Sequence, residues 1–342
     1  MEQGLTETDA LVVGAGPVGL FQVFQLGLQE IRAHVVDSLP YAGGQCVELY
    51  GDKPIYDIPG ISVATGRELT ERLLQQVEPF SPTLHFNQVV SEVERQADGR
   101  FRVATSQGTQ FLTKTLFIAA GVGAFQPRML KVDGIEKFAS QVAYRVEDPA
   151  QFAGRDVLVL GDEDPALQAA CDLAATARVT LLHRRDGFRA DPSRVAAMRE
   201  LVAQGRMQFK VGQVTGLREA GGRLAAVEVA APDATVSALP TDVVLVMLGI
   251  SPKLGPIADW GLDLERKQLK VDTEQFSTSV PGIFAVGDIN TYPGKKKLIL
   301  CGFHEATLAA FGAAAIVFPG KEIHLQYTTT STKLHRLLGV SG

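Results

Sequence analysis

The chain has 342 residues, of which 46% are hydrophobic and 21% are charged, and its formal net charge is -5 at pH 7. These values are those of an ordinary soluble globular protein, and the length allows two domains. The negative charge argues against general nucleic-acid binding, which needs a basic surface to neutralise phosphates.

The cysteines and the apolar runs narrow the class of protein further. Cys46, Cys171 and Cys301 lie far apart, with no pair at C-x-x-C spacing, so we expect neither a disulfide framework nor a metal site. The acidic first residues run directly into a strand, so no signal peptide is expected. The longest apolar run, 309–318, is too short to span a bilayer. The sequence therefore predicts a soluble, cytoplasmic protein that inserts into no membrane.

A nucleotide-binding unit begins near the N-terminus. Strand, tight turn, helix and second strand are expected in DALVVGAGPVGLFQVFQLGLQEIRAHVVDS. Gly14, Gly16 and Gly19 form G-x-G-x-x-G at the turn, with Pro17 at the start of the helix. Asp37 ends the second strand roughly 20 residues later, which is the spacing of a dinucleotide-binding fingerprint.

Each part of this fingerprint has a physical role. Gly14 permits a sharp turn, Gly16 lets the backbone approach a pyrophosphate, and Gly19 lets helix and strand pack closely. The helix N-terminus attracts the anion, and Asp37 can accept hydrogen bonds from a ribose. A lone glycine triplet is a weak signal, but here the strand, the helix and the terminal acid agree, so a dinucleotide site is expected.

The segments that follow suggest more than a plain nucleotide-binding unit. A helix is expected over 65–80. Three short strands then form a meander with turns at Asp98-Gly99 and Gln107-Gly108. The chain leaves this unit through a linker that contains Gly and Pro, around 121–134.

A second strand–turn–helix–strand pattern begins at Asp156 and reaches 178–190. A helix over 193–205 and a second meander follow, and a later strand ends at Gly287-Asp288, ahead of a last helix over about 303–317. This order predicts an α/β protein with two Rossmann-like, three-layer dinucleotide-binding domains, the second inserted into the first. We expect residues 1–122 and 283–342 to form the first domain and residues 123–282 to form the second.

The turn of the second pattern carries acids where phosphate is expected. Asp162 and Glu163 stand between Gly161 and the helix that begins near Pro165, and acids favour a helix N-terminus for the same reason that a phosphate does. A plain helix cap would explain them equally well. Against this, the segment HRRDGFR follows a strand end, and its arginines suit the 2′-phosphate of NADP by bidentate pairing.

Several separated segments together resemble a known family. They are GAGPVG, GGQC (43–46), IAAGVG (118–123), HRRDGFR (183–189) and VPGIFAVGDI (280–289). The chain is similar to the two-dinucleotide-domain flavoproteins, and within them to the thioredoxin-reductase-like ferredoxin–NADP⁺ reductases. GGQCVELYGDKPIYDIPG, TYPGKKKLILCGFHEA and YTTTSTKLHRLLGV look like this subfamily, and the likeness covers essentially the whole chain.

The resemblance implies FAD on the first domain. Tyr50 and Tyr327 look like stacking partners for the isoalloxazine ring. A carboxylate at a strand end, Asp288, can bind ribityl hydroxyls, and the helix that starts near His304 can aim its positive end at the ring. The residues implied as FAD contacts are Gly14, Gly16, Pro17, Gly19, Asp37, Gln45, Tyr50, Val90, Phe125, Asp288 and Thr329.

The resemblance also implies NADP(H) on the second domain. The family loop is normally G-G-G-D-S-A, and aligned on Asp164 and Ala166 this chain has G-D-E-D-P-A, so two glycines have become Asp162 and Glu163. We expect a weakened NADPH site for this reason. The residues implied as NADP contacts are Gly161, Asp164, Ala166, Arg184, Arg185 and Arg189.

The implied function is that of an FAD-dependent ferredoxin (or flavodoxin)–NADP⁺ reductase. Hydride passes between NADPH and FAD, and single electrons pass between FAD and an iron–sulfur or flavodoxin carrier. No catalytic side chain is expected, because the cofactor carries the chemistry. Members of this family are typically homodimers. The run Lys295-Lys296-Lys297 follows the Gly287-Asp288 turn, and we expect it to steer an acidic ferredoxin.

Three other functions are weighed against this one. A thioredoxin reductase needs C-x-x-C in its second domain, which this chain lacks. A Baeyer–Villiger monooxygenase carries a histidine-centred linker motif, and the linker 121–141 contains no histidine. A divergent paralogue that acts as a non-catalytic FAD-binding sensor or interaction protein stays open, because of the acids in the second turn.

Overall fold

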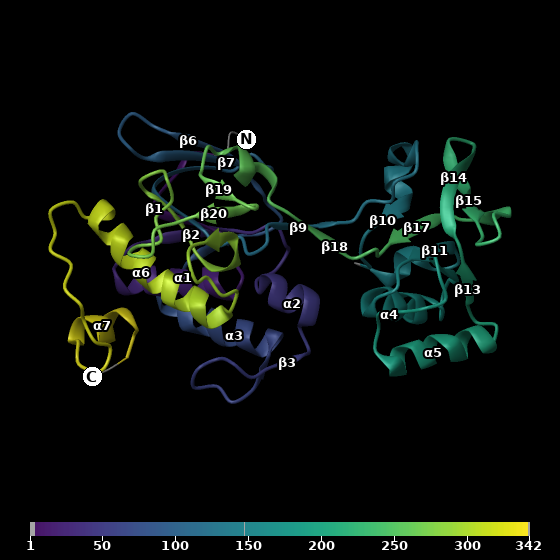
Figure 1. Cartoon of the computed structure of the whole chain (residues 1–342), viewed down its shortest axis with the longest axis horizontal. Helices are drawn as coiled ribbons and strands as arrows, with labels where there is room; N and C mark the ends of the chain where they lie inside the picture. Colours follow the sequence, from purple (N-terminus) through teal and green to yellow (C-terminus); the bar gives the residue numbers. More distant parts are fainter. Residues whose placement is uncertain (1–3, 147, 341–342) are drawn as a thin grey trace. The chain divides into compact units, whose positions relative to one another are not determined.

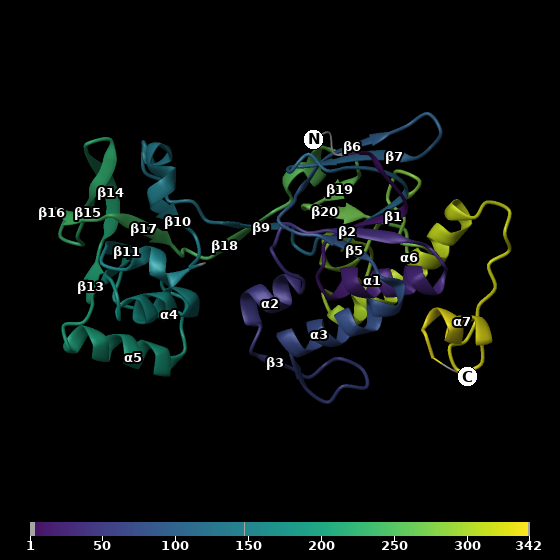
Figure 2. The ribbon, with the colours of Figure 1, turned by 180° about the vertical axis from the view of Figure 1, so that it is seen from behind.

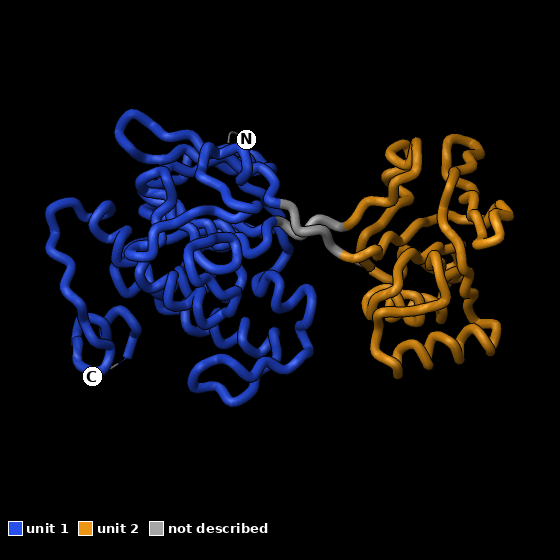
Figure 3. Tube along the Cα trace, viewed as in Figure 1, with its two compact units in different colours: residues 1–125, 252–342 blue, residues 126–251 orange. Residues whose placement is uncertain are grey.

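The computed structural model describes residues 4–146 and 148–340. The chain divides into two compact units, which we call unit 1 (residues 1–125 and 252–342) and unit 2 (residues 126–251), as Figure 3 shows. The second unit is thus inserted into the first, as the sequence predicts. The chain returns to unit 1 at Pro252, well before the predicted boundary at 283.

Unit 1 is built on a mixed sheet with strand order β5-β2-β1-β8-β7-β6, in which β21 also pairs with β8 (Figure 1). The pairs β1–β2, β1–β8, β2–β5 and β8–β21 are parallel, and the meander β6–β7–β8 is antiparallel. Its strands are β1 (Thr6–Val13), β2 (Ala33–Val36), β5 (Thr83–His85), β6 (Val90–Arg95), β7 (Phe101–Thr105), β8 (Gln110–Ile118) and β21 (Ile283–Ala285).

Helices cover one face of this sheet, and the same arrangement is seen from behind in Figure 2. Alternate residues of β1 divide between the faces: Ala10 and Val12 pack under the helices, whereas Leu11 and Val13 pack on the other side. The helices of unit 1 are α1 (Pro17–Leu28), α2 (Gly44–Tyr50), α3 (Gly66–Val77), α6 (Ile299–Val317) and α7 (Thr332–Leu337).

The other face of the sheet explains where the unit boundary lies. Ile257, Leu262 and Leu269 are buried against this face, in one cluster with Leu11 and Ile118. Their apolar side chains complete the core of unit 1, so the segment after Pro252 cannot belong to unit 2. The remaining short strands of unit 1 are β3 (Pro54–Ile55), β4 (Ala64–Thr65), β19 (Leu264–Glu265), β20 (Gln268–Lys270) and β22 (Asn290–Thr291).

The predicted helix over 65–80 is present as α3, and its start follows from a capping box. Thr65 accepts a hydrogen bond from the backbone N–H of Glu68, and the Glu68 carboxylate accepts one from the backbone N–H of Thr65. The predicted meander is present as β6 to β8. The last helix was placed too late, because α6 begins at Ile299 rather than near 303.

Unit 2 repeats the arrangement of unit 1 with different sequence. Its parallel sheet has strand order β10-β17-β11-β12-β13, so β11 lies between β12 and β17 as β1 lies between β2 and β8. Helices α4 and α5 pack on one face and the sheet β14-β15-β16 on the other, which makes three layers. The elements are β10 (Val142–Ala143), β11 (Asp156–Leu160), α4 (Asp164–Leu173), β12 (Arg178–His183), α5 (Pro192–Ala203), β13 (Gln208–Val211), β14 (Gln213–Ala220), β15 (Arg223–Ala230), β16 (Val236–Pro240) and β17 (Val243–Val246).

Strands β9 (Ala124–Pro127) and β18 (Ile250–Lys253) pair with each other where the chain passes between the units. Helix α6 is long and apolar enough to cross a membrane by length and composition. It nevertheless lies in the core of unit 1, where Ala309, Ala310 and Ala313 are fully buried with the side chains of α1 and β1. The small side chains let α6 approach α1 closely, so its apolar character is that of a core helix.

Candidate functional site

A cavity opens in unit 1 at the carboxyl ends of the parallel strands β1 and β8. This is the edge at which ligands bind in open α/β sheets, because the loops that follow the strands meet there. The turn into α1, the end of β2, α2 and the Gly287-Asp288 turn all contribute to it. Of the predicted FAD contacts, it is lined by Gly14, Gly16, Pro17, Asp37, Gln45, Tyr50, Val90 and Asp288.

The three glycines of the first turn serve two purposes. Gly14 has φ +110°, and a Cβ added there would overlap the carbonyl oxygen of Ala119. A Cβ added at Gly19 would overlap the carbonyl oxygen of Gly14. These two glycines are therefore required by the fold itself.

Gly16 is different, because the protein leaves space beside it. A Cβ added at Gly16 would have no protein atom within 4 Å, and its φ of -69° is open to any residue. Gly16 is also the N-cap of α1, and it lines the cavity. The helix N-terminus thus presents bare backbone to the cavity, which fits a pyrophosphate group.

Asp37 holds the turn together beneath the cavity. Its carboxylate accepts hydrogen bonds from the backbone N–H of Ala15 at 2.6 Å and of Leu39 at 2.8 Å. Only 7% of Asp37 is exposed, and this burial raises the pKa of its carboxyl group despite the two hydrogen bonds. Each carboxylate oxygen can accept a further hydrogen bond, so Asp37 is able to bind a ribose hydroxyl.

Helix α2, which the sequence did not predict, carries Gln45, Cys46 and Tyr50 to the cavity. Its N-cap, Gly43 at φ +116°, and its first residue, Gly44 at φ +51°, both have left-handed backbone. The hydroxyl of Tyr50 lies 3.7 Å from the Cys46 sulfur, and burial raises the pKa of Tyr50. The signal for this helix was the Gly-Gly pair, which by itself indicates only a turn.

Asp288 and the start of α6 complete the cavity on the side of β21. The side chain of Asp288 lines the cavity, and burial raises its pKa against the opposing charges of Lys295 and Lys297. The predicted helix start near His304 was wrong, because α6 begins at Ile299, which itself lines the cavity. The positive end of α6 therefore lies at the cavity, as proposed, but earlier in the chain.

Sequence reasoning missed part of the lining. Leu254, Pro256, Ile257 and Trp260 lie at the cavity, although the sequence assigned them to the second domain. Lys297 also lies there. No local motif marks these residues, since only the long-range packing of the segment after Pro252 brings them to the site.

Besides Gly19, which serves the packing of the turn, two residues predicted to contact FAD are not at the cavity. Tyr327 is 65% exposed, and neither it nor Thr329 is among the described residues that line the cavity. The segment that carries them is anchored elsewhere on unit 1, because Lys333 and Lys321 both pair with Glu30 beyond the end of α1. The side chain of Phe125, a third predicted contact, lies outside the described part of the chain.

The corresponding turn in unit 2 has the same backbone plan. Gly161 follows β11, and a Cβ added there would overlap the carbonyl oxygen of Met247. Glu163 is the N-cap of α4 with an extended backbone (φ -104°, ψ 168°), which is the place that Gly16 holds in α1. Where unit 1 presents bare backbone, unit 2 therefore carries a glutamate side chain.

The acids of this turn pair with nearby arginines. Asp162 is buried, and its two oxygens lie 2.9 and 3.0 Å from Nε and Nη2 of Arg189. This hydrogen bonding holds the pKa of Asp162 below its usual range. The same guanidinium lies 3.0 Å from Oε1 of Glu163, and Arg194 pairs with Asp164 at 3.2 Å.

The pairing changes the predicted roles of the basic residues. Arg189, predicted as a contact of the 2′-phosphate, is already bound to two carboxylates in this structure. Arg184 and Arg185 lie exposed just after β12, and within the described residues neither forms an ion pair. Ala166 is buried against Gly161, so it belongs to the packing of the turn.

Comparison with known protein families supports this arrangement of two units. The family described as pyridine nucleotide-disulphide oxidoreductase matches residues 52–287. A protein named ferredoxin–NADP reductase 2 from Cupriavidus metallidurans is 65% identical over 98% of this chain and 92% of its own length. A ferredoxin–NADP reductase from Polaromonas naphthalenivorans is 63% identical over 99% of this chain and 94% of its own length.

Solved structures show the same fold at low sequence identity. The bacillithiol disulfide reductase of Staphylococcus aureus gives a TM-score of 0.64 at 17% identity, over 91% of this chain and 99% of its own. The thioredoxin reductase of Lactococcus lactis gives a TM-score of 0.60 at 23% identity, also over 91% and 99%. At these identities the likeness concerns the fold alone.

Proposed function

The chain belongs to the ferredoxin–NADP reductase family of the pyridine nucleotide-disulphide oxidoreductases, and we propose that it transfers electrons between NADPH and a ferredoxin through FAD held in the cavity of unit 1. Bound FAD supplies the redox chemistry, since it exchanges a hydride with NADPH and single electrons with the carrier. The side chains of this protein bind and orient, and none is required as an acid, base or nucleophile.

One observation carries the assignment of FAD to unit 1. Gly16 stands at the N-terminus of α1 and lines the cavity, yet the protein itself leaves the space beside its Cα open. A glycine that the fold does not require indicates room reserved for a ligand. The amides at the start of α1 favour an anion in that room, so the pyrophosphate of a dinucleotide fits it.

Other residues of the cavity suit other parts of FAD. We propose that Asp37 accepts hydrogen bonds from the ribose of the adenosine half. Tyr50 packs against the ring system, and Asp288 binds the hydroxyls of the ribityl chain. The N-terminus of α6 places a positive potential at the same end of the cavity, which stabilises negative charge gained on reduction.

We propose that NADPH binds at the turn of unit 2, with Arg184 and Arg185 at its 2′-phosphate. The exposed ends of these side chains suit this role, whereas Glu163 brings a carboxylate to the N-cap position of α4. Because the side chains of Glu163 and Arg189 are 39% and 58% exposed, their ion pair is weak enough to open for a phosphate. The expected result is NADPH binding that is selective but weakened.

We also propose a flavodoxin as a second possible carrier, a homodimer as the working assembly, and the cytoplasm as the location. The non-catalytic alternative has less in its favour. After β12, unit 2 keeps the exposed Arg184 and Arg185, which form no ion pair among the described residues and suit the 2′-phosphate of NADPH.

The test is NADPH-dependent reduction of a purified [2Fe–2S] ferredoxin by the FAD-loaded protein, followed by the loss of the ferredoxin's visible absorbance under anaerobic conditions. We expect reduction with NADPH and much slower reduction with NADH. The matched variant Arg184→Ala should remove most of the preference for NADPH. No transfer to either a ferredoxin or a flavodoxin, with FAD bound, would favour the non-catalytic alternative.

A further inference from the structure

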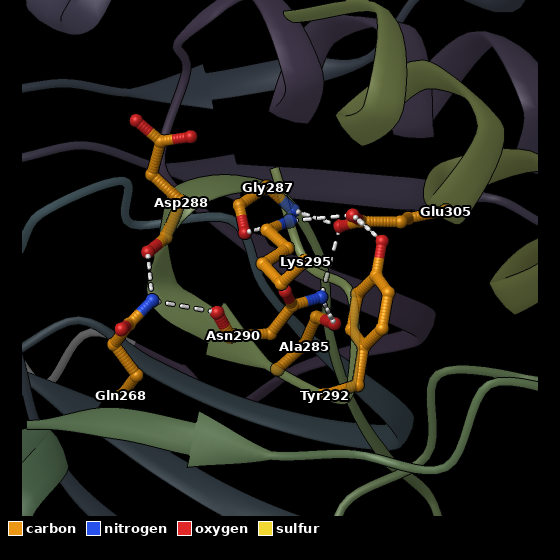
Figure 4. A network of polar contacts seen from close by, with 8 residues as sticks. All are labelled: Gln268, Ala285, Gly287, Asp288, Asn290, Tyr292, Lys295 and Glu305. Carbon is orange, nitrogen blue, oxygen red and sulfur yellow. Dashed lines mark hydrogen bonds and ion pairs between the residues drawn. The ribbon is translucent and has the colours of Figure 1, made fainter. Parts of the chain in front are cut away.

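A buried charge in α6 has no role in the function proposed so far. Glu305 is fully buried, and its carboxylate accepts four hydrogen bonds (Figure 4). One oxygen accepts from the backbone N–H of Gly287 at 2.7 Å and from Nδ2 of Asn290 at 2.9 Å. The other accepts from the hydroxyl of Tyr292 at 2.9 Å and from Nζ of Lys295. All the acceptor positions of the carboxylate are therefore filled.

Lys295 supplies the positive charge that pairs with the Glu305 carboxylate. Its side chain is only 6% exposed, so it is not part of a solvated lysine run and cannot steer a carrier as the sequence suggested. Its Nζ donates to Glu305 and also to the carbonyl oxygen of Gly287 at 2.9 Å. The two partners of the ion pair thus bind the N–H and the C=O of one and the same residue.

That residue lies directly before the predicted ribityl contact. Gly287 has φ +81°, which is a conformation that an L side chain rarely adopts. Gln268 binds the turn from the opposite side, donating to the carbonyl oxygens of Asp288 at 3.2 Å and Asn290 at 2.8 Å. With the backbone fixed at these points, the side chain of Asp288 is directed away from the network, and it lines the cavity (Figure 4).

An ion pair is an unusual way to hold a core together. Burying two charged groups costs more free energy than burying an apolar pair of similar volume. Replacing such an ion pair by apolar side chains is therefore often neutral or stabilising. What the charged groups add here is directional bonding to both polar groups of Gly287. An apolar pair could fill the same volume, but it could not fix the orientation of the two peptide groups that flank Gly287.

We propose that Lys295 and Glu305 form a clamp on Gly287 that positions Asp288 for FAD binding. The inference rests on the function proposed above, and it assigns Lys295 and Glu305 as positioning residues that act through Asp288 rather than by touching the cofactor. Loss of the clamp leaves the peptide before Asp288 free to rotate, so the carboxylate leaves the orientation that binds the ribityl hydroxyls.

The dissociation constant of FAD tests this directly, measured by fluorescence titration of protein stripped of cofactor. The variants are Lys295→Met, Asp288→Asn and the two combined. The matched control is Lys114→Met, which breaks another ion pair of unit 1, to Asp9 at 2.8 Å, away from the cavity. We expect Lys295→Met to raise the Kd of FAD about tenfold and Lys114→Met to leave it within about twofold.

The combined variant separates positioning from a general loss of structure. If Lys295 acts through Asp288, the combined variant should bind FAD no more weakly than Asp288→Asn alone, within about twofold. Effects that multiply, or a Lys295→Met protein with the wild-type Kd, would overturn the clamp and leave the proposed function intact. A wild-type protein that binds no FAD would instead overturn the proposed function.

A second variant guards against misfolding, since Lys295→Met leaves Glu305 without its cation. In Lys295→Met/Glu305→Gln the amide oxygen still accepts from Gly287, and no unpaired charge remains buried. We expect the stripped protein to keep the wild-type melting temperature more closely than Lys295→Met, while its Kd for FAD stays raised about tenfold because the Gly287 carbonyl has lost its donor. A wild-type Kd in this variant overturns the proposal.

Discussion

At the scale of single residues, one position separates the two nucleotide turns. Gly16 and Glu163 occupy the same N-cap place with the same extended backbone, and only the glutamate has a side chain, which pairs with Arg189. The sequence predicted that both acids of the second turn oppose a phosphate. The structure instead buries Asp162 against Arg189 and leaves Glu163 partly exposed, so their effects should differ.

Gly16→Ala and Gly19→Ala should separate binding from folding. The first adds a methyl group to space that the protein leaves open, so the stripped protein should lose at most about 1 kcal/mol of stability while FAD binding weakens by about tenfold or more. The second forces a methyl group into the Gly14 carbonyl and should cost about 1–3 kcal/mol of stability before any FAD is added. Thermal unfolding of the stripped protein and FAD titration give the two numbers. Equal loss of stability in both variants would contradict this account of Gly16.

Glu163→Gly and Asp162→Asn should affect different properties, the first NADPH affinity and the second stability. Glu163→Gly removes a negative charge from the N-cap of α4, so the Kd of NADPH should fall about three- to tenfold without loss of stability. Asp162→Asn replaces the buried carboxylate that accepts from Arg189 and should cost about 1–3 kcal/mol of stability. Calorimetric titration with NADPH and urea unfolding are the measurements. Unchanged NADPH affinity in Glu163→Gly would show that this side chain does not stand in the way of the phosphates.

At the scale of elements, the sequence predicted most of what local patterns encode. The first fingerprint, α3 with its capping box and the β6–β8 meander all follow from turn residues and apolar spacing. The start of α6 was placed too late, because its first turn contains Ile299 and Leu300 without a capping side chain to mark it. Helix α2 was missed since its glycines indicate only a turn.

The parts of the site that could not be predicted depend on contacts between distant segments. Trp260 reaches the cavity only because its segment packs on the far face of the unit 1 sheet. Asp162 is buried because its turn pairs with the segment of Arg189, through a backbone β-bridge between Glu163 and Arg189 and the hydrogen bond from Arg189 to Asp162. No local pattern reveals this pairing. Lys295 looked like one of three solvated lysines, and its burial depends on Glu305 in a different element.

One edge of the unit 1 sheet should make stability depend on pH. His34 in β2 and His85 in β5 share a hydrogen bond at 3.0 Å, and burial lowers the pKa of both rings. Their folded pKa values lie below the unfolded value of about 6.5, so the stabilisation is present above pH 6.5 and is lost as the pH falls through the folded values. The melting temperature should therefore drop between pH 7.5 and about 5 more steeply in the wild type than in His85→Gln. Parallel curves for the two proteins would rule out this pair as the source.

At the scale of the whole molecule, two units of the same plan serve different nucleotides in the proposed function. Unit 1 offers an open helix end at Gly16, and unit 2 offers exposed arginines and a carboxylate at the N-cap of its helix. The whole chain carries a net charge of -5, so an acidic carrier needs a local basic surface to approach it. Lys295 is buried and cannot contribute to such a surface, whereas Lys296 and Lys297 are exposed.

Carrier docking should therefore depend on Lys296 rather than on net charge alone. Lys296→Gln should raise the KM for ferredoxin about twofold at low ionic strength and have no effect at about 0.5 M salt, where exposed charges are screened. Lys137→Gln changes the net charge by the same amount at an exposed position in unit 2, and it should leave the KM unchanged. Identical kinetics for the two variants across salt would remove the docking role of this loop.

The central claim is that NADPH reduces FAD bound to this chain, and anaerobic rapid mixing tests it most directly. FAD-loaded protein is mixed with increasing NADPH, and the visible absorbance of the flavin is followed with time. The account predicts complete bleaching with NADPH, at a rate that saturates with nucleotide concentration, and far slower bleaching with NADH. Faster reduction at low NADPH is expected for Glu163→Gly. Flavin that stays oxidised at saturating NADPH, in the wild type and in Glu163→Gly alike, would contradict it.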